Sequence, residues 1–167
     1  TNDVCGFDAA RKLAILSSIG FRANVTFDDV LVEGIEKIDK SDIQYAKDMG
    51  YTIKLLTVAL RQENGIALNV YPAFLPDNHP LSSVKGAYNA IYVTGNIVDD
   101  VMFYGRGAGA LPTASAVMGD VISTAQHILN GSTGTGMIMT DTKRIPFYSS
   151  LKLQNSYYFR LDVDDVT

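Results

Sequence analysis

Residues 51–76 read YTIKLLTVALRQENGIALNVYPAFLP, and this stretch decides the fold. Two runs rich in apolar and β-branched residues, 51–60 and 66–75, flank a polar break that ends in Asn-Gly. An Asn-Gly pair between such runs is a strong short-range signal for a β-hairpin, because both residues tolerate the positive φ angles of a tight turn. We therefore predict an antiparallel hairpin here.

The rest of the chain supplies a second hairpin and three helices, judged from hydrophobic periodicity and from helix start and stop signals. The expected strands are 30–38, 88–94 and 101–104, and the expected helices are 7–21, 41–49 and 113–129. This order predicts an α+β fold, with a mixed, mostly antiparallel sheet covered by helices on one face. It lacks the regular strand–helix alternation of a nucleotide-binding domain.

Composition narrows the class of protein. A chain of 167 residues with 47% hydrophobic residues can bury the core of one domain. The net charge of −4 argues against a nucleic-acid partner. The one cysteine and two histidines lie in no cluster with metal-ligand spacing, so we expect neither disulfides nor a metal site. No run approaches the about 18 apolar residues of a membrane span, and we expect a cytoplasmic protein without a membrane partner.

The two ends of the chain suggest a piece of a longer protein. The sequence opens without methionine, and its last residues, 156–167, alternate as a β-strand does. That strand is either an edge of this domain's own sheet or the start of a further domain, and the pattern alone fits both. Residues 131–136 and 140–144 predict an exposed, polar linker before it.

A glycine-rich junction follows the second hairpin, where residues 101–120 read VMFYGRGAGALPTASAVMGD. Closely spaced glycines let backbone N–H groups approach a ligand, and the start of the next helix favours an anionic group. Gly105, Gly107 and Ala110 fit the G-x-G-x-x-G/A pattern, but no strand ending in an acidic residue follows at the required distance of roughly 20 residues. A dinucleotide-binding turn, a plain turn and a different ligand-facing loop all stay open.

Asp8 and Lys12 lie four residues apart in the first expected helix, so both project from the same side. One interpretation is a surface ion pair that contributes little to stability. The other is a lysine acting as general acid or base, oriented by a carboxylate. Burial would lower the pKa of the lysine and the carboxylate would raise it, so the spacing alone leaves both interpretations open.

Residues 6–16, GFDAARKLAIL, resemble the G-x-D-x-x-x-K segment of the homoserine dehydrogenase family. The resemblance continues in the family's order through 50–56 (GYTIKLL), 79–84 (HPLSSV), 89–91 (NAI) and 105–117 (GRGAGALPTASAV) with Asp120. These blocks cover about residues 2 to 130. Each block is weak alone, and together they are specific.

The resemblance implies that residues 1–145 are the catalytic domain of that family, which binds substrate and forms a homodimer. Residues 146–167 would be a linker and the first strand of a truncated ACT regulatory domain, and the family's N-terminal nucleotide-binding domain would be absent. The implied enzyme is an oxidoreductase that interconverts L-homoserine and L-aspartate 4-semialdehyde with NAD or NADP, on the pathway to threonine, methionine and isoleucine. Because the absent domain would bind most of the cofactor, the isolated chain is expected to be inactive.

The resemblance also implies roles for single residues. Lys12 falls on the family's catalytic lysine, and Asp8 falls on the acidic residue beside it; both would contact the substrate. Asp3 falls on a further acidic residue that holds the substrate's amino group. Gly107 and Gly109 belong to the loop that meets the nicotinamide end of the cofactor. Lys85 departs from the family, which often has asparagine at that position.

Two other functions compete with this reading. The first is an α+β enzyme that handles phosphate with the glycine-rich loop and Arg106. The second is a non-enzymatic dimerisation or regulatory module, in which the Asp8–Lys12 pair is structural. The fold alone does not choose among the three, because unrelated functions share folds.

Overall fold

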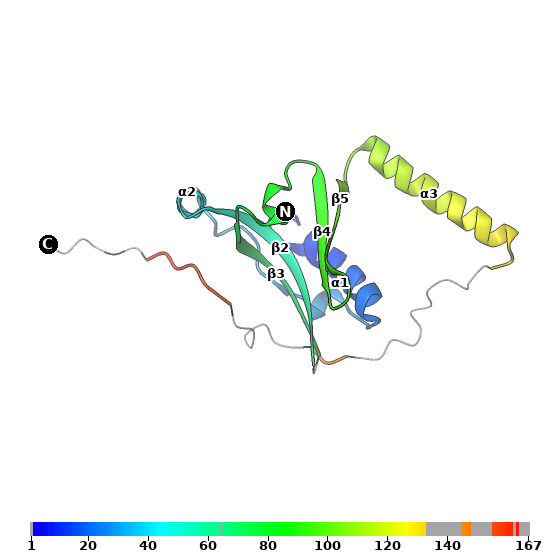
Figure 1. The fold of residues 1–167 in the computed structure, drawn as a ribbon, viewed down its shortest axis with the longest axis horizontal. Helices are drawn as coiled ribbons and strands as arrows, with labels where there is room; N and C mark the ends of the chain where they lie inside the picture. The colour runs from blue at the N-terminus through cyan, green and yellow to red at the C-terminus, as the bar shows by residue number, and fades with distance from the viewer. Residues whose placement is uncertain (1, 64, 133–144, 148–154, 162, 164–167) are drawn as a thin grey trace.

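The computed structural model describes residues 2–63, 65–132, 145–147, 155–161 and 163 (Figure 1). The elements are α1 (Phe7–Phe21), η1 (Phe27–Asp29), β1 (Leu31–Val32), α2 (Lys40–Asp48), β2 (Tyr51–Gln62), β3 (Gly65–Pro76), η2 (Pro80–Ser83), β4 (Tyr88–Gly95), β5 (Asp99–Arg106) and α3 (Ala110–Leu129). The strands form one three-stranded and one two-stranded sheet. The predicted α+β class is confirmed.

Both predicted hairpins are confirmed. β2 and β3 pair antiparallel along their whole length, from Tyr51 opposite Pro76 to Gln62 opposite Gly65. β4 and β5 pair in the same way and form the separate two-stranded sheet. β1 adds the parallel component of the mixed sheet by pairing with the middle of β3.

The strand expected over 30–38 is much shorter than predicted, because β1 spans only Leu31–Val32. The pairing of β1 with β3 ends with a hydrogen bond from the Glu33 N–H to the Val70 carbonyl at 2.7 Å. Beyond it, Gly34 packs so tightly on the backbone of Val4 and Cys5 that a Cβ would lie 2.5 Å from the Val4 oxygen. This contact directs the chain away from the sheet.

The core lies between α1 and the β2–β3 hairpin. Its buried residues are Ala10, Leu13 and Ala14 of α1, Ile66, Leu68 and Val70 of β3, and Ala23, Val25 and Val30 of the connecting segment. Residues 65–70 of β3 are all buried, so both faces of this strand are covered. The Ile66 N–H also donates to the carbonyl of Pro146, so residues 145–147 return to the start of β3.

Helix α2 begins and ends close to the predicted positions. The Asp39 side chain is its N-cap, and Asp42 completes a reciprocal capping box. Gly50, at φ 78°, takes the left-handed conformation that commonly follows a helix. α1 and α2 both pack against β2.

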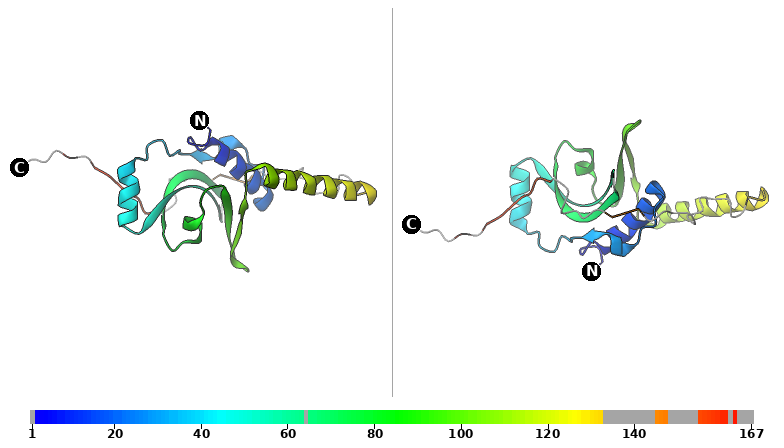
Figure 2. Two further views of the ribbon diagram at one scale, coloured as in Figure 1. Left: turned by 90° about the horizontal axis from the view of Figure 1, so that it is seen from above. Right: turned by 90° about the horizontal axis from the view of Figure 1, so that it is seen from below.

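Helix α3 starts three residues earlier than predicted and does not lie on the sheet. Pro112 lies in the first turn of α3, where the N–H that proline lacks would have no intrahelical partner. Proline is therefore tolerated inside the helix at this position and does not mark its first residue. None of the 20 residues of α3 is buried. The helix extends away from both sheets in every view, so the covering expected of the helices comes from α1 and α2 (Figures 1 and 2).

The strand expected over 156–167 is not formed in the part of it that the structure describes. Residues 155–161 and 163 have no regular secondary structure. A strand needs a partner strand for its backbone hydrogen bonds. These residues instead place the side chains of Tyr158 and Arg160 against α2. Positions 162 and 164–167, and the expected linker beyond Ser132, lie outside the described residues. Among the described helices, none combines the length and apolarity needed to cross a membrane.

Candidate functional site

The turn of residues 2–6 fixes the chain that leads into α1. Gly6 has φ 80°, and a Cβ there would lie 3.1 Å from methyl groups of both Val32 and Val70. Glycine therefore allows both the left-handed conformation and the close approach to the sheet. The Asn2 carbonyl accepts the Phe7 N–H at 2.9 Å, which holds the turn against the start of the helix.

Asp8 and Lys12 form an ion pair on the exposed side of α1. The Lys12 Nζ atom lies 2.7 Å from Asp8 Oδ2, as their spacing predicts. The two side chains remain 68% and 46% exposed, so a ligand can reach both. A hydrogen-bonded amine and carboxylate on an open surface can exchange a proton with a substrate, or can remain a plain surface pair.

Asp3 lies in the turn that precedes α1, and its side chain is exposed. Its carbonyl accepts the Gly6 N–H at 3.1 Å, which sets the backbone at this position. Within the described ranges, no hydrogen bond or ion pair links the Asp3 carboxylate to Asp8 or Lys12. The structure thus brings Asp8 and Lys12 together and leaves Asp3 open to solvent, a few residues away along the chain.

Gly107 and Gly109 lie between β5 and α3, in a loop that packs against β4. A Cβ at Gly107 would lie 2.2 Å from Nδ2 of Asn89, and the Gly107 N–H donates to the Ala87 carbonyl at 3.3 Å. Asn89 of β4 therefore packs against the loop, a contact that the sequence did not reveal because it joins residues 18 positions apart in the chain. Gly109 is the N-cap of α3, with φ 120° and ψ 156°. The first N–H groups of α3 begin here, so the loop fits an electron-rich ligand group.

Gly109→Ala is expected to lower the free energy of unfolding by about 1–3 kcal/mol, because its backbone region is essentially restricted to glycine. Gly105→Ala is the matched control: Gly105 lies in the same run, and a Cβ there would have nothing within 4 Å. Urea denaturation followed by circular dichroism measures both variants. Equal stability of the two would contradict the assigned backbone strain.

The Arg106 side chain packs on an aromatic stack. Its Cζ atom lies 5.0 Å from the centre of the Tyr88 ring, and its Nε–H donates to the Tyr88 hydroxyl at 3.4 Å. Tyr88 stacks in turn on Tyr104, with ring centres 4.8 Å apart. This arrangement gives no support to a phosphate site built on Arg106.

His79 and the neighbouring polar groups have structural roles. The His79 Nδ1 atom accepts the Leu81 N–H at 3.1 Å and caps η2, while its ring packs against Tyr92. A hydrogen bond from Tyr92 lowers the pKa of the Asp100 carboxyl and raises the pKa of the Tyr92 hydroxyl. Across the described residues, no three His, Cys, Asp or Glu side chains gather as metal ligands would.

Comparison with known proteins gives one consistent family. The family sequence model described as homoserine dehydrogenase matches residues 1–122. Homoserine dehydrogenases of Bacillus subtilis and Corynebacterium glutamicum are 46% and 42% identical to the chain, over 83% and 99% of its length. The chain covers 32% and 38% of those two proteins, so it spans about a third of the curated relatives it matches.

Solved structures show the same similarity. The crystal structure of a homoserine dehydrogenase from Thiobacillus denitrificans matches with a TM-score of 0.83 and 38% identity, covering 89% of this chain and 35% of that one. A homoserine dehydrogenase of S. aureus at pH 7.5 matches with a TM-score of 0.71 and 41% identity. The latter match covers 77% of this chain and 32% of the other.

Proposed function

The chain belongs to the homoserine dehydrogenase family, and from this premise we propose that it is the catalytic domain of an oxidoreductase acting on homoserine. The enzyme interconverts L-homoserine and L-aspartate 4-semialdehyde with NAD or NADP, on the cytoplasmic pathway to threonine, methionine and isoleucine. The observation that carries the proposal is the ion pair of Lys12 and Asp8 on α1, which a ligand can reach. Residues 1–145 are proposed as this domain, and 146–167 as the linker and start of an ACT-like domain.

Lys12 is proposed as the group that moves the proton. A bound nicotinamide cofactor would supply the hydride acceptor for oxidation of the alcohol, and the hydroxyl proton would then need a base. In its neutral form the Lys12 amine accepts that proton at Nζ and becomes the ammonium. In the reverse direction the Lys12 ammonium returns the proton and stabilises the negative charge that develops on oxygen.

The two carboxylates are proposed to orient Lys12 and to hold the substrate. Asp8 fixes the Lys12 side chain through the 2.7 Å contact, which limits the rotamers it can adopt. Asp3 and Asp8 both offer carboxylate oxygens that can pair with the substrate ammonium. Such placement lowers the activation barrier, because the entropic cost of bringing the reacting groups together is met when the substrate binds.

Gly107 and Gly109 are proposed to face the nicotinamide end of the cofactor. The start of α3, with Gly109 as its N-cap, presents the first N–H groups of the helix there, which supports the fit. The remainder of the cofactor would be bound by the nucleotide-binding domain of the complete protein. The preference between NAD and NADP would then be determined in that domain.

A homodimer is proposed, formed through the sheet of β4 and β5. Ile91 lies opposite Phe103, and Val93 lies opposite Val101, so these four apolar side chains share one face of the hairpin. All four are exposed. An apolar sheet face of this kind is stabilised when a second copy covers it.

The proposed function is tested with the full-length protein by following homoserine-dependent reduction of NAD and of NADP. Turnover with either cofactor is the expected result, and a folded wild-type protein that is inert towards homoserine would overturn the proposal. Saturable binding of inorganic phosphate that is lost in Arg106→Ala would instead favour the phosphate-handling alternative.

A further inference from the structure

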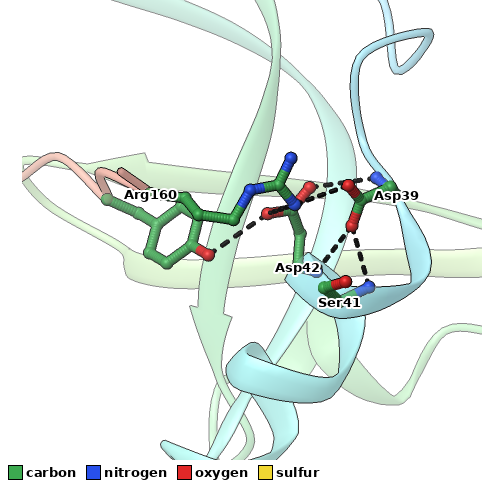
Figure 3. A network of polar contacts seen from close by, with 5 residues as sticks. Asp39, Ser41, Asp42 and Arg160 are labelled. Atoms are coloured by element: carbon green, nitrogen blue, oxygen red, sulfur yellow. Dashed lines mark hydrogen bonds and ion pairs between the residues drawn. The ribbon is translucent and has the colours of Figure 1, made fainter. Parts of the chain in front are cut away.

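The described C-terminal segment lies against the start of α2 (Figure 3). Tyr158 and Arg160 contact Asp39 and Asp42, which are 116 to 121 residues earlier in the chain. These contacts join the segment that follows the catalytic domain to a helix of the domain itself.

Arg160 lies between two carboxylates that also cap α2. Its Nη1 atom donates to Asp42 Oδ1 at 2.8 Å and to Asp39 Oδ2 at 2.5 Å. Asp39 uses its other oxygen to accept the Ser41 and Asp42 N–H groups, and Asp42 uses its other oxygen to accept the Asp39 N–H. The guanidinium therefore offsets the repulsion of two like charges that the capping box brings together.

The pKa values of the ionised groups agree with this geometry. The backbone N–H of Asp42 and, after it, the Arg160 guanidinium lower the pKa of the Asp39 carboxyl. The hydrogen bond to Asp39 raises the pKa of Arg160. Asp39 and Arg160 are thus both held in their charged forms.

Tyr158 adds a second, partly apolar attachment. Its hydroxyl donates to Asp42 Oδ1 at 3.1 Å, and its ring stacks on Phe74 of β3 with the ring centres 4.7 Å apart. An exposed ion pair alone holds a chain weakly. Here the Asp42 side chain is only 6% exposed, so the segment is bound to a buried carboxylate and to the sheet together.

The loop before α2 connects this attachment to the turn that carries Asp3. The Ile35 N–H donates to the Val4 carbonyl at 3.0 Å, and the Cys5 thiol donates to Glu36 Oε1 at 3.2 Å. Gly34 packs directly on Val4 and Cys5. The loop 33–39 therefore has one end at the cap of α2 and the other against the residues next to Asp3.

We propose that residues 155–160 form a strap that holds the N-terminal cap of α2 and, through the loop 33–39, steadies the turn that carries Asp3. A rearrangement in the chain after residue 160 that withdraws Arg160 then loosens this turn and weakens binding of the substrate ammonium. The strap makes the substrate site responsive to the segment that follows it. The effect on substrate binding rests on the proposed function, whereas the strap itself does not.

Arg160→Ala in the full-length protein tests the strap, with Arg61→Ala as the control. Arg61 is an exposed residue at the far end of β2, opposite Ile66. Hydrogen exchange followed by mass spectrometry should show amides of the first turn of α2 and of residues 3–6 exchanging several-fold faster in Arg160→Ala. The KM for homoserine should rise while kcat is largely kept, and Arg61→Ala should match wild type in both measurements.

A second variant, Asp39→Asn, removes one of the two charges that Arg160 binds and keeps a good N-cap residue. It should speed exchange at residues 3–6 as Arg160→Ala does, and the double variant should add little to either single change. Unchanged exchange in Arg160→Ala overturns the strap. Faster exchange in α2 with unchanged exchange at residues 3–6 overturns the link to the substrate site. If wild type is inert towards homoserine, the proposed function fails, and the exchange experiment alone decides the strap.

Discussion

Lys12→Ala in the full-length protein is expected to lower kcat for homoserine oxidation by about 10²–10⁴-fold, the range that a positioned acid–base group contributes. The variant removes the one amine that the 2.7 Å contact with Asp8 holds in place. Because Lys12 is 68% exposed, its loss leaves no cavity and the fold should survive. Lys12→Ala should therefore lower kcat and change the free energy of unfolding little.

Steady-state kinetics with circular dichroism checks this expectation. Lys47→Ala is the matched control, since Lys47 is also a helical, exposed lysine, in the last turn of α2. It should turn over like wild type. A folded Lys12→Ala enzyme with the activity of Lys47→Ala would show that the pair with Asp8 is structural.

Ile66→Ala is expected to lower the free energy of unfolding by about 2–5 kcal/mol, the usual cost of truncating a buried isoleucine. Ile66 is 0% exposed and lies in the cluster between α1 and β3. Other members of that cluster, such as Leu13 of α1 and Val70 of β3, are held by a helix and by a paired strand, so the cluster cannot collapse fully into the space. A cavity would remain and add to the lost burial.

Ile97→Ala is the control for this change, because Ile97 is 88% exposed in the turn between β4 and β5. Ile97→Ala should change the free energy of unfolding by no more than about 0.5 kcal/mol. Urea denaturation of the chain, monitored by circular dichroism, compares both variants with wild type. A similar loss of stability in the two variants would contradict the assigned core.

The hairpins and helices could be predicted from the sequence because their signals are local. The Asn-Gly pair in the sequence predicted the β2–β3 hairpin, and Asp39 caps α2 within one turn of its start. The length of β1 could not be predicted, since it depends on how tightly Gly34 packs against Val4, some 30 residues earlier. Period-two alternation near the C-terminus suggested a strand, but alternation does not reveal whether a neighbouring strand exists.

In the candidate site, too, local signals predicted some features and missed the contacts between distant parts of the chain. The spacing of Asp8 and Lys12 predicted their contact, because residues four apart on a helix lie side by side. The roles proposed for them rest on the family resemblance, and the same holds for the roles proposed for Asp3 and Gly109. The contacts of Asn89 with Gly107 and of Arg160 with Asp39 join distant parts of the chain. No local pattern reports such contacts.

The most direct test of the account is rescue of the folded Lys12→Ala enzyme by a small primary amine. Homoserine oxidation would be followed as methylamine is added, in parallel with Lys47→Ala. The account predicts that methylamine restores part of the lost turnover in Lys12→Ala and leaves Lys47→Ala unchanged, because the added amine takes over the proton. Full turnover by Lys12→Ala without any amine would contradict the central claim that Lys12 moves the proton.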